Sequence, residues 1–128
     1  MVGALRQGDV YWVDGVGVSL TELGGRRPVI VTQGNRLNES RIRTVIVSTL
    51  TSNLERANDI GNVLLDDGEA NLSKRSVVNV SQFHVLDKAD LVEYIGTLSK
   101  ARVRQIVAGI TLTFAVVAVS ETPEMPEP

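Results

Sequence analysis

A series of short strand-like segments followed by one long helical segment is the feature that most constrains the fold. Hydrophobic residues recur at mostly helical spacing from residue 100 to about 115, and Ser99 before them is a good N-cap. Five to seven short β-rich segments precede this helix. The order predicts a mainly β chain with α (α+β), in which a small, curled, mostly antiparallel sheet is capped by the C-terminal helix.

The individual strands are predicted from alternating residue types and from the glycine, proline or polar residues that bound them. Four glycines predict a loop at 15–25, and a turn is predicted at 34–40. Asp87 is predicted to be the N-cap of a helical turn at 87–92, with Asp90 completing a weakened capping box. The predicted strands are 9–13, 29–32, 41–48, 62–65, 76–80 and 82–86.

The length of 128 residues predicts one domain at 1–120, followed by a disordered acidic, proline-rich tail at 121–128. The absence of cysteine excludes disulfides, thiolate catalysis and zinc–thiolate sites, and is compatible with a cytoplasmic protein. The N-terminus lacks the apolar run of a signal peptide, and the apolar segment 106–119 is shorter than the roughly 20 residues that cross a bilayer. We therefore expect a cytoplasmic protein without a membrane anchor.

Positive charge is concentrated in one part of an acidic chain. The formal net charge is −2, yet the segment 26–56 holds six arginines against two glutamates, a local balance of +4. Such a local basic face favours a specific anionic partner over indiscriminate coating of nucleic acid. A solvated charged surface is the alternative interpretation.

Several catalytic classes lack the residues they need. His84 is the only histidine, which excludes catalysis by two histidines and histidine-rich metal sites. The chain has no phosphate-binding, dinucleotide-binding or nucleophile-elbow glycine motif. We therefore expect neither a metal nor a cofactor, and arginine remains as the chemically informative residue.

Arg27 precedes Pro28, which disfavours the helical region for the residue before it. A guanidinium keeps its charge and matches phosphate with two parallel hydrogen bonds. The pattern therefore predicts a fixed cation where a strand begins, although a surface salt bridge is the alternative. A second cluster, the hydroxyl-rich 48–53, ends the clearest strand; it suits either a turn or, if Thr51 meets Arg27, a phosphate site.

The segments GDVYWVD, GGRRPVIVTQ, TVIVSTLTSN, SVVNVSQFHVLDK and IGTLS, in this order before a terminal helix, resemble the MazF/PemK family of toxin endoribonucleases of type II toxin–antitoxin systems. The resemblance covers residues 7 to about 114, nearly all of the predicted domain. It implies a small SH3-like, PemK-type barrel. It also implies that Arg27, before the proline, and Thr51, at the strand end, are the catalytic pair.

The same resemblance and the hydroxyl cluster predict the residues that bind RNA. Thr21 and Leu23 replace a serine and a glutamine of the family's loop motif, and His84 stands where the family commonly has arginine. His84 is interpreted as a catalytic group that titrates near physiological pH or as a partly buried or RNA-contacting residue. The predicted RNA-binding residues are Thr21, Glu22, Arg26, Gln33, Asn35, Ser52, Asn53, Gln82 and His84.

The resemblance implies metal-independent cleavage of single-stranded RNA, often mRNA, at short sequences. The implied route is attack of a 2′-hydroxyl on its neighbouring phosphodiester. It further implies a homodimer, for which the apolar segment 106–119 suits either core or dimer packing, and a cognate antitoxin protein. Two other hypotheses remain: a CcdB-like gyrase-binding toxin, which would share the fold without the chemistry, and a catalytically inactive small-barrel interaction module.

Overall fold

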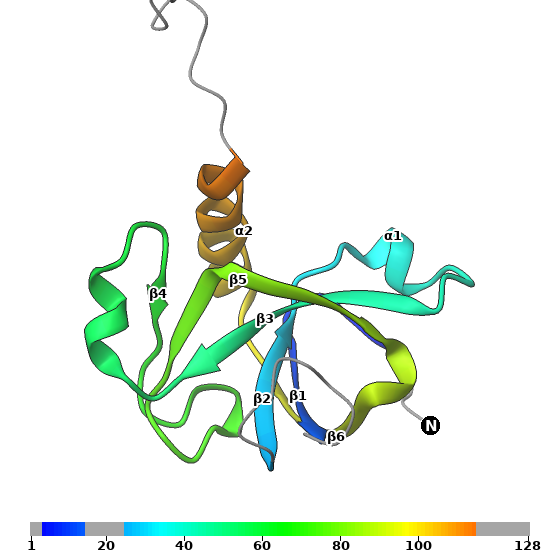
Figure 1. The fold of residues 1–128 in the computed structure, drawn as a ribbon, viewed down its shortest axis with the longest axis horizontal. Coiled ribbons are helices and arrows are strands. Elements are labelled where there is room, and N and C mark those ends of the chain that lie inside the picture. Colours follow the sequence, from blue (N-terminus) through cyan, green and yellow to red (C-terminus); the bar gives the residue numbers. More distant parts are fainter. Residues whose placement is uncertain (1–3, 15–24, 115–128) are drawn as a thin grey trace, which may run out of the picture.

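A computed structural model describes residues 4–14 and 25–114, in which six strands form one sheet of order β4-β5-β3-β2-β1-β6, with every neighbouring pair antiparallel (Figure 1). The helix α2 stands over the β4–β5 end of this curled sheet, away from the short α1 (Figure 1). The strands are β1 (Asp9–Asp14), β2 (Arg26–Val31), β3 (Thr44–Thr51), β4 (Val63–Leu64), β5 (Val77–Asp87) and β6 (Leu91–Thr97). The helices are α1 (Asn35–Asn38) and α2 (Lys100–Phe114), with 3-10 turns η2 (Leu54–Asn58), η3 (Glu69–Asn71) and η4 (Lys88–Asp90).

This architecture confirms the predicted α+β fold and the terminal helix. The Ser99 hydroxyl accepts a hydrogen bond from the backbone N–H of Arg102, as expected of an N-cap. The capping box of Asp87 and Asp90 is also formed. The predicted loop 15–24, the tail 121–128 and the end of the apolar segment 106–119 lie outside the described residues, so the domain boundary stays a prediction.

Two strand predictions were wrong. The segments 76–80 and 82–86 form a single strand, β5, because residues 80–82 are accommodated as a bulge between the pairs Ser48↔Phe83 and Thr49↔Asn79. The helical turn predicted at 87–92 ends at Asp90, and the chain continues as the unpredicted strand β6. That strand lies at an edge of the sheet, and two register shifts against β1 accompany its irregular pattern.

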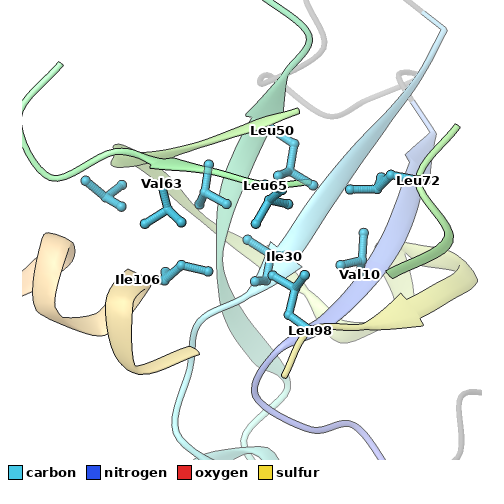
Figure 2. Packing of buried hydrophobic residues seen from close by; sticks show 10 residues of the cluster. Val10, Ile30, Leu50, Val63, Leu65, Leu72, Leu98 and Ile106 are labelled. Atoms are coloured by element: carbon cyan, nitrogen blue, oxygen red, sulfur yellow. The ribbon is translucent and has the colours of Figure 1, made fainter. Parts of the chain in front are cut away.

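Buried side chains form two clusters, on the two faces of the sheet. One cluster lies between the sheet and α2; Ile106 of α2 belongs to it together with Ile30 and Leu50 of the central strands (Figure 2). The other cluster lies on the opposite face of the central strands and includes Val29 and Val47. Successive residues of β2 and β3 therefore alternate between the two clusters, which fixes the face that each polar side chain occupies.

The helix α2 packs unusually close to the chain before β4. A methyl group added to Gly109 would lie 2.2 Å from the carbonyl oxygen of Gly61, so this crossing requires glycine at 109. Arg102 adds a two-pronged ion pair from α2 to Glu69 of η3. Within 4–14 and 25–114, no helix is both long and apolar enough to cross a membrane.

Candidate functional site

The strands β2 and β3 bring Arg27 and Thr51 to one end of the sheet. Their antiparallel ladder pairs Val29 with Thr49 and Val31 with Val47. The same register, continued by two residues, sets Arg27 opposite Thr51. The ladder begins directly after Pro28, which has no N–H to donate, so both residues lie just beyond the hydrogen-bonded pairs of these strands.

The two neighbouring arginines have different surroundings. Arg26 donates to Glu93 at 2.5 Å, and its guanidinium lies over the ring of Trp12, 5.0 Å from the ring centroid. Arg27 points to the other face and is half-buried; no described residue offers it a hydrogen bond or ion pair. Within residues 4–14 and 25–114, Arg27 thus provides a positive charge without a partner, whereas Arg26 is paired with Glu93.

Thr51 is fixed at the end of β3 by the turn that follows it. Its hydroxyl oxygen accepts a hydrogen bond of 3.1 Å from the backbone N–H of Asn53. The Asn53 side chain in turn accepts from the N–H of Glu55 and caps η2. Within the described ranges, no acceptor is recorded for the Thr51 hydroxyl hydrogen. Ser52 and Asn53 are exposed beside it, but the side-chain oxygen of Asn53 is already occupied by the hydrogen bond from the N–H of Glu55.

Two predicted RNA-binding residues, Gln33 and Asn35, belong to a hydrogen-bond network around α1. Gln33 is only 5% exposed; its amide nitrogen donates to Asn38 and its oxygen accepts from the N–H of Ile46. The side-chain oxygen of Asn35 accepts from the N–H of Gln7 at 2.7 Å and from Asn38. The amide of Gln33 is fully engaged, so this geometry gives no support to a direct RNA contact by Gln33. Asn35 is half-buried and its amide nitrogen has no hydrogen bond among the described residues, so its predicted RNA contact stays a prediction.

Gln82 and His84 lie on β5. Gln82 is exposed within the three-residue bulge, while the half-buried His84 is paired with Val47 and therefore shares the face of Thr49 and Thr51. The structure brings His84 onto the face of the predicted catalytic pair, two rows of the sheet away. Thr21 and Glu22, the remaining predicted RNA-binding residues, lie outside the described residues.

Two further polar residues on this face escaped the sequence analysis. Thr49 lies two residues before Thr51, and Asn79 is its partner on β5, joined to it by a side-chain hydrogen bond of 3.2 Å. Thr49 was hidden within the hydroxyl cluster. The signal for Asn79 was available, because it interrupts the otherwise apolar run VVNV.

Asp9 and Tyr11 of β1 lie on this same face of the sheet. Tyr11, opposite Val29, has its pKa raised to about 12 by burial and by the nearby carboxylate of Asp9, so its phenol remains neutral. Residues 4–14 and 25–114 contain no group of three or more histidine or acidic side chains that could hold a metal ion.

Comparisons with known proteins agree on one family. Residues 6–114 match the model of the PemK-like, MazF-like toxins of type II toxin–antitoxin systems. Endoribonuclease MazF6 of Mycobacterium tuberculosis is 34% identical over 106 residues, which cover 83% of this chain and 93% of the relative. Endoribonuclease MazF of Staphylococcus saprophyticus is 33% identical over 102 residues, covering 80% and 84%.

Solved structures show the same fold. An endoribonuclease from a mycobacterial species, in complex with its cognate antitoxin, aligns with a TM-score of 0.70 at 22% identity and covers 87% of this chain and 95% of its own. MazF from Deinococcus radiodurans aligns with a TM-score of 0.68 at 18% identity, covering 88% and 98%. At these sequence identities the structural similarity shows that the fold is shared and nothing more.

Proposed function

Because the chain belongs to the PemK-like, MazF-like toxin family of type II toxin–antitoxin systems, we infer that it is a toxin endoribonuclease restrained by a cognate antitoxin. Relatives that share about a third of its residues over most of its length carry the name endoribonuclease, and one structural neighbour is bound to its antitoxin. These findings support the ribonuclease over the gyrase-binding toxin and the inactive module.

We propose Arg27 and Thr51 as the catalytic pair. The observation that carries this assignment is the contrast between the two arginines: Arg26 is paired and stacked, while Arg27 has no partner in the described part of the chain and faces the end of β3 where Thr51 lies. A half-buried guanidinium without a counter-ion is a site for an anion. The phosphodiester of single-stranded RNA supplies one.

The proposed reaction is an in-line attack of the ribose 2′-hydroxyl on the adjacent phosphorus. The 2′-hydroxyl gives up its proton to solvent as its oxygen forms the new P–O bond, and the bond between phosphorus and the 5′-oxygen breaks. The products are a 2′,3′-cyclic phosphate and, once the 5′-oxygen takes a proton from solvent, a 5′-hydroxyl. Negative charge accumulates on the phosphate oxygens, where the fork of Arg27 stabilises it. Thr51 hydrogen-bonds the phosphate or the 2′-hydroxyl. No step requires a metal.

We propose that the protein is a homodimer, because an apolar strip is exposed on the opposite face. Ile46 and Val85 are cross-strand partners and are 37% and 63% exposed. On the same face, Phe83 meets Phe114 at the end of α2 with ring centroids 5.2 Å apart. Analytical ultracentrifugation tests this surface: Val85→Glu should shift a dimer toward the monomer, and an unchanged dimer would exclude it.

Sequencing of RNA ends after brief incubation with the purified protein in EDTA tests the function. Cuts with a 5′-hydroxyl at recurring short sequences are expected. An RNA left intact, or cleaved only after divalent metal is added, contradicts the proposed chemistry. Inhibition of DNA supercoiling without RNA cleavage would instead favour the gyrase-binding alternative.

A further inference from the structure

Three polar side chains form a row across three strands, immediately beside the Arg27–Thr51 pair. Asn62, just before β4, donates to the side-chain oxygen of Asn79 at 3.3 Å. Asn79 donates from its amide nitrogen to the hydroxyl oxygen of Thr49 at 3.2 Å. The register of β3 and β5 places Thr49 opposite Asn79, and Thr51 follows in the next row on the same face. Successive rows lie roughly 7 Å apart along a strand.

Backbone groups fix the direction of this chain of hydrogen bonds. The Asn62 side-chain oxygen accepts from the N–H of Val80 at 2.9 Å, and its nitrogen donates to the carbonyl of Arg56 at 2.9 Å. A backbone N–H can only donate and a backbone carbonyl can only accept, so the amide of Asn62 has a single orientation. Its nitrogen must then face the oxygen of Asn79, and the nitrogen of Asn79 must face Thr49.

The chain therefore ends in two unused donors. Both hydrogens of the Asn62 amide are engaged, but Asn79 uses only one of its two. Thr49 accepts from Asn79, which leaves its own hydroxyl hydrogen free; no described residue accepts either group. Both side chains are half-buried. Neutral donors that are held rigidly and left without acceptors are suited to recognition, because a ligand supplies the missing bonds.

We propose that Thr49 and Asn79 form a donor subsite that binds a hydrogen-bond acceptor on a nucleotide base next to the scissile phosphate. This proposal rests on the proposed function and adds a determinant of sequence preference to it. The acceptor is a base carbonyl or ring nitrogen, because these donors carry no charge and Arg27 already provides the cation for phosphate. Contacts to phosphate supply affinity, whereas contacts to base edges supply discrimination.

A purely structural row predicts different behaviour. In that case the hydrogen bonds of Thr49 and Asn79 only connect η2 and the start of β4 to the sheet. Removing those bonds lowers the stability of the fold and does not change which RNA sequences are cut. A base contact predicts that removing one donor weakens discrimination at a single nucleotide position. For a specific hydrogen-bonded base contact worth about 1–3 kcal/mol, the corresponding change is roughly 5- to 150-fold.

The test is RNA-end sequencing on a randomised single-stranded substrate with Thr49→Val, which removes the hydroxyl and keeps the side-chain shape. We expect the preference at one position to fall at least 5-fold, and Thr49→Ser, which retains the hydroxyl, to keep the wild-type profile. Asn79→Asp keeps the acceptor for Asn62 and replaces the donor; it should alter the same position. Asn71→Asp, which loses a hydrogen bond to the carbonyl of Ile95 that is not part of this row, is the matched control.

Each outcome decides the proposal. Unchanged profiles in folded Thr49→Val and Asn79→Asp overturn it. A uniform loss of cleavage at all sequences in Thr49→Val also overturns it, because that result identifies a contact without base discrimination. Thermal unfolding of every variant separates these results from loss of the fold. A wild-type protein that cleaves no RNA refutes the proposed function itself, whereas cleavage with profiles indifferent to both substitutions refutes only the subsite.

Discussion

Two hydrogen-bond networks lie at opposite ends of the central strands β2 and β3, and they differ in whether their donors have acceptors. Around α1, Gln33 and Asn38 exchange hydrogen bonds with each other and with the backbone, and both are buried. At the other end of β2 and β3, the row through Asn79 stops at Thr49 with free donors, next to an arginine that has no partner among the described residues.

The difference separates structure from binding. A buried amide with all its hydrogen bonds made contributes to stability and has nothing to offer a ligand. A half-buried donor with a missing acceptor contributes less to stability and gains an interaction when a ligand arrives. On this criterion we expect Gln33 to be a structural residue, although its position in the sequence motif predicts RNA binding, and we expect Arg27 and Thr49 to be binding residues.

The largest expected effect follows from Arg27→Ala. Removing a charge-stabilising donor from a reaction of this kind lowers kcat by about 10²- to 10³-fold. The measurement is single-turnover cleavage of a defined RNA. Arg26→Ala is the matched control, because Arg26 already pairs with Glu93 and stacks on Trp12, and it should lower the rate less than about 10-fold. Equal losses in the two variants would remove the distinction between the arginines.

The two predicted RNA-binding glutamines provide the next contrast. Gln33→Leu leaves Asn38 and the N–H of Ile46 without their partner, so we expect the free energy of unfolding to fall by about 2–3 kcal/mol. Gln82→Leu, at the exposed bulge of β5, should leave stability unchanged and weaken RNA cleavage. Chemical denaturation and cleavage rates measured on both variants decide the point. A stable but inactive Gln33→Leu would show that Gln33 contacts RNA after all.

Local patterns predict this fold well because its strands and its helix are marked by short-range signals. Ser99 and the helical spacing behind it place α2 correctly, and alternation places β1 correctly and β3 three residues too early. The strand β6 was missed because it is an edge strand with shifted register, so its residues do not alternate cleanly.

The site depends on longer-range information. That Arg27 and Thr51 lie opposite each other follows from the register of β2 with β3, and the Asn79–Thr49 bond joins residues 30 positions apart. Sequence motifs name the residue types, but only the paired strands show which polar groups remain free.

The ion pair of Glu69 with Arg102 is a charged network whose groups already have partners, so its contribution to stability can be tested by changing the pH. Glu69 accepts two short bonds from Arg102; burial alone would raise its pKa, but the bonds from Arg102 and from the N–H of Asp66 lower it overall. A lowered pKa means that the pair stabilises the fold above the ordinary pKa of glutamate and that this contribution is lost as the pH falls through the folded-state value. Glu69→Gln should therefore lower the free energy of unfolding by about 2 kcal/mol at pH 7.

In acid, the deficit of Glu69→Gln relative to the wild type should disappear. Urea unfolding at a series of pH values measures it. Asp67→Asn, at an exposed acid on the neighbouring turn, is the control and should behave like the wild type at every pH. A deficit that persists below the folded-state pKa of Glu69 would mean that the loss arises from packing and not from charge.

The smallest effect is expected at Ser48, whose hydroxyl is buried away from solvent and also lacks a hydrogen-bond partner among the described residues. Ser48 is fully buried between its cross-strand partners Ile30 and Phe83, and its hydroxyl has no hydrogen-bond partner among the described residues. A buried unpaired hydroxyl costs free energy, so Ser48→Ala should leave stability unchanged or raise it by up to about 1 kcal/mol. Ser76→Ala is the matched control: its buried hydroxyl donates to the carbonyl of Lys74 at 2.9 Å, and its removal should cost about 1 kcal/mol. If Ser48→Ala proves as costly as Ser76→Ala in urea unfolding, the Ser48 hydroxyl is satisfied by an internal water. Ser48 would then belong with the closed networks, and Thr49 and Thr51 would remain the open positions of β3 on the face of Arg27 within the described residues.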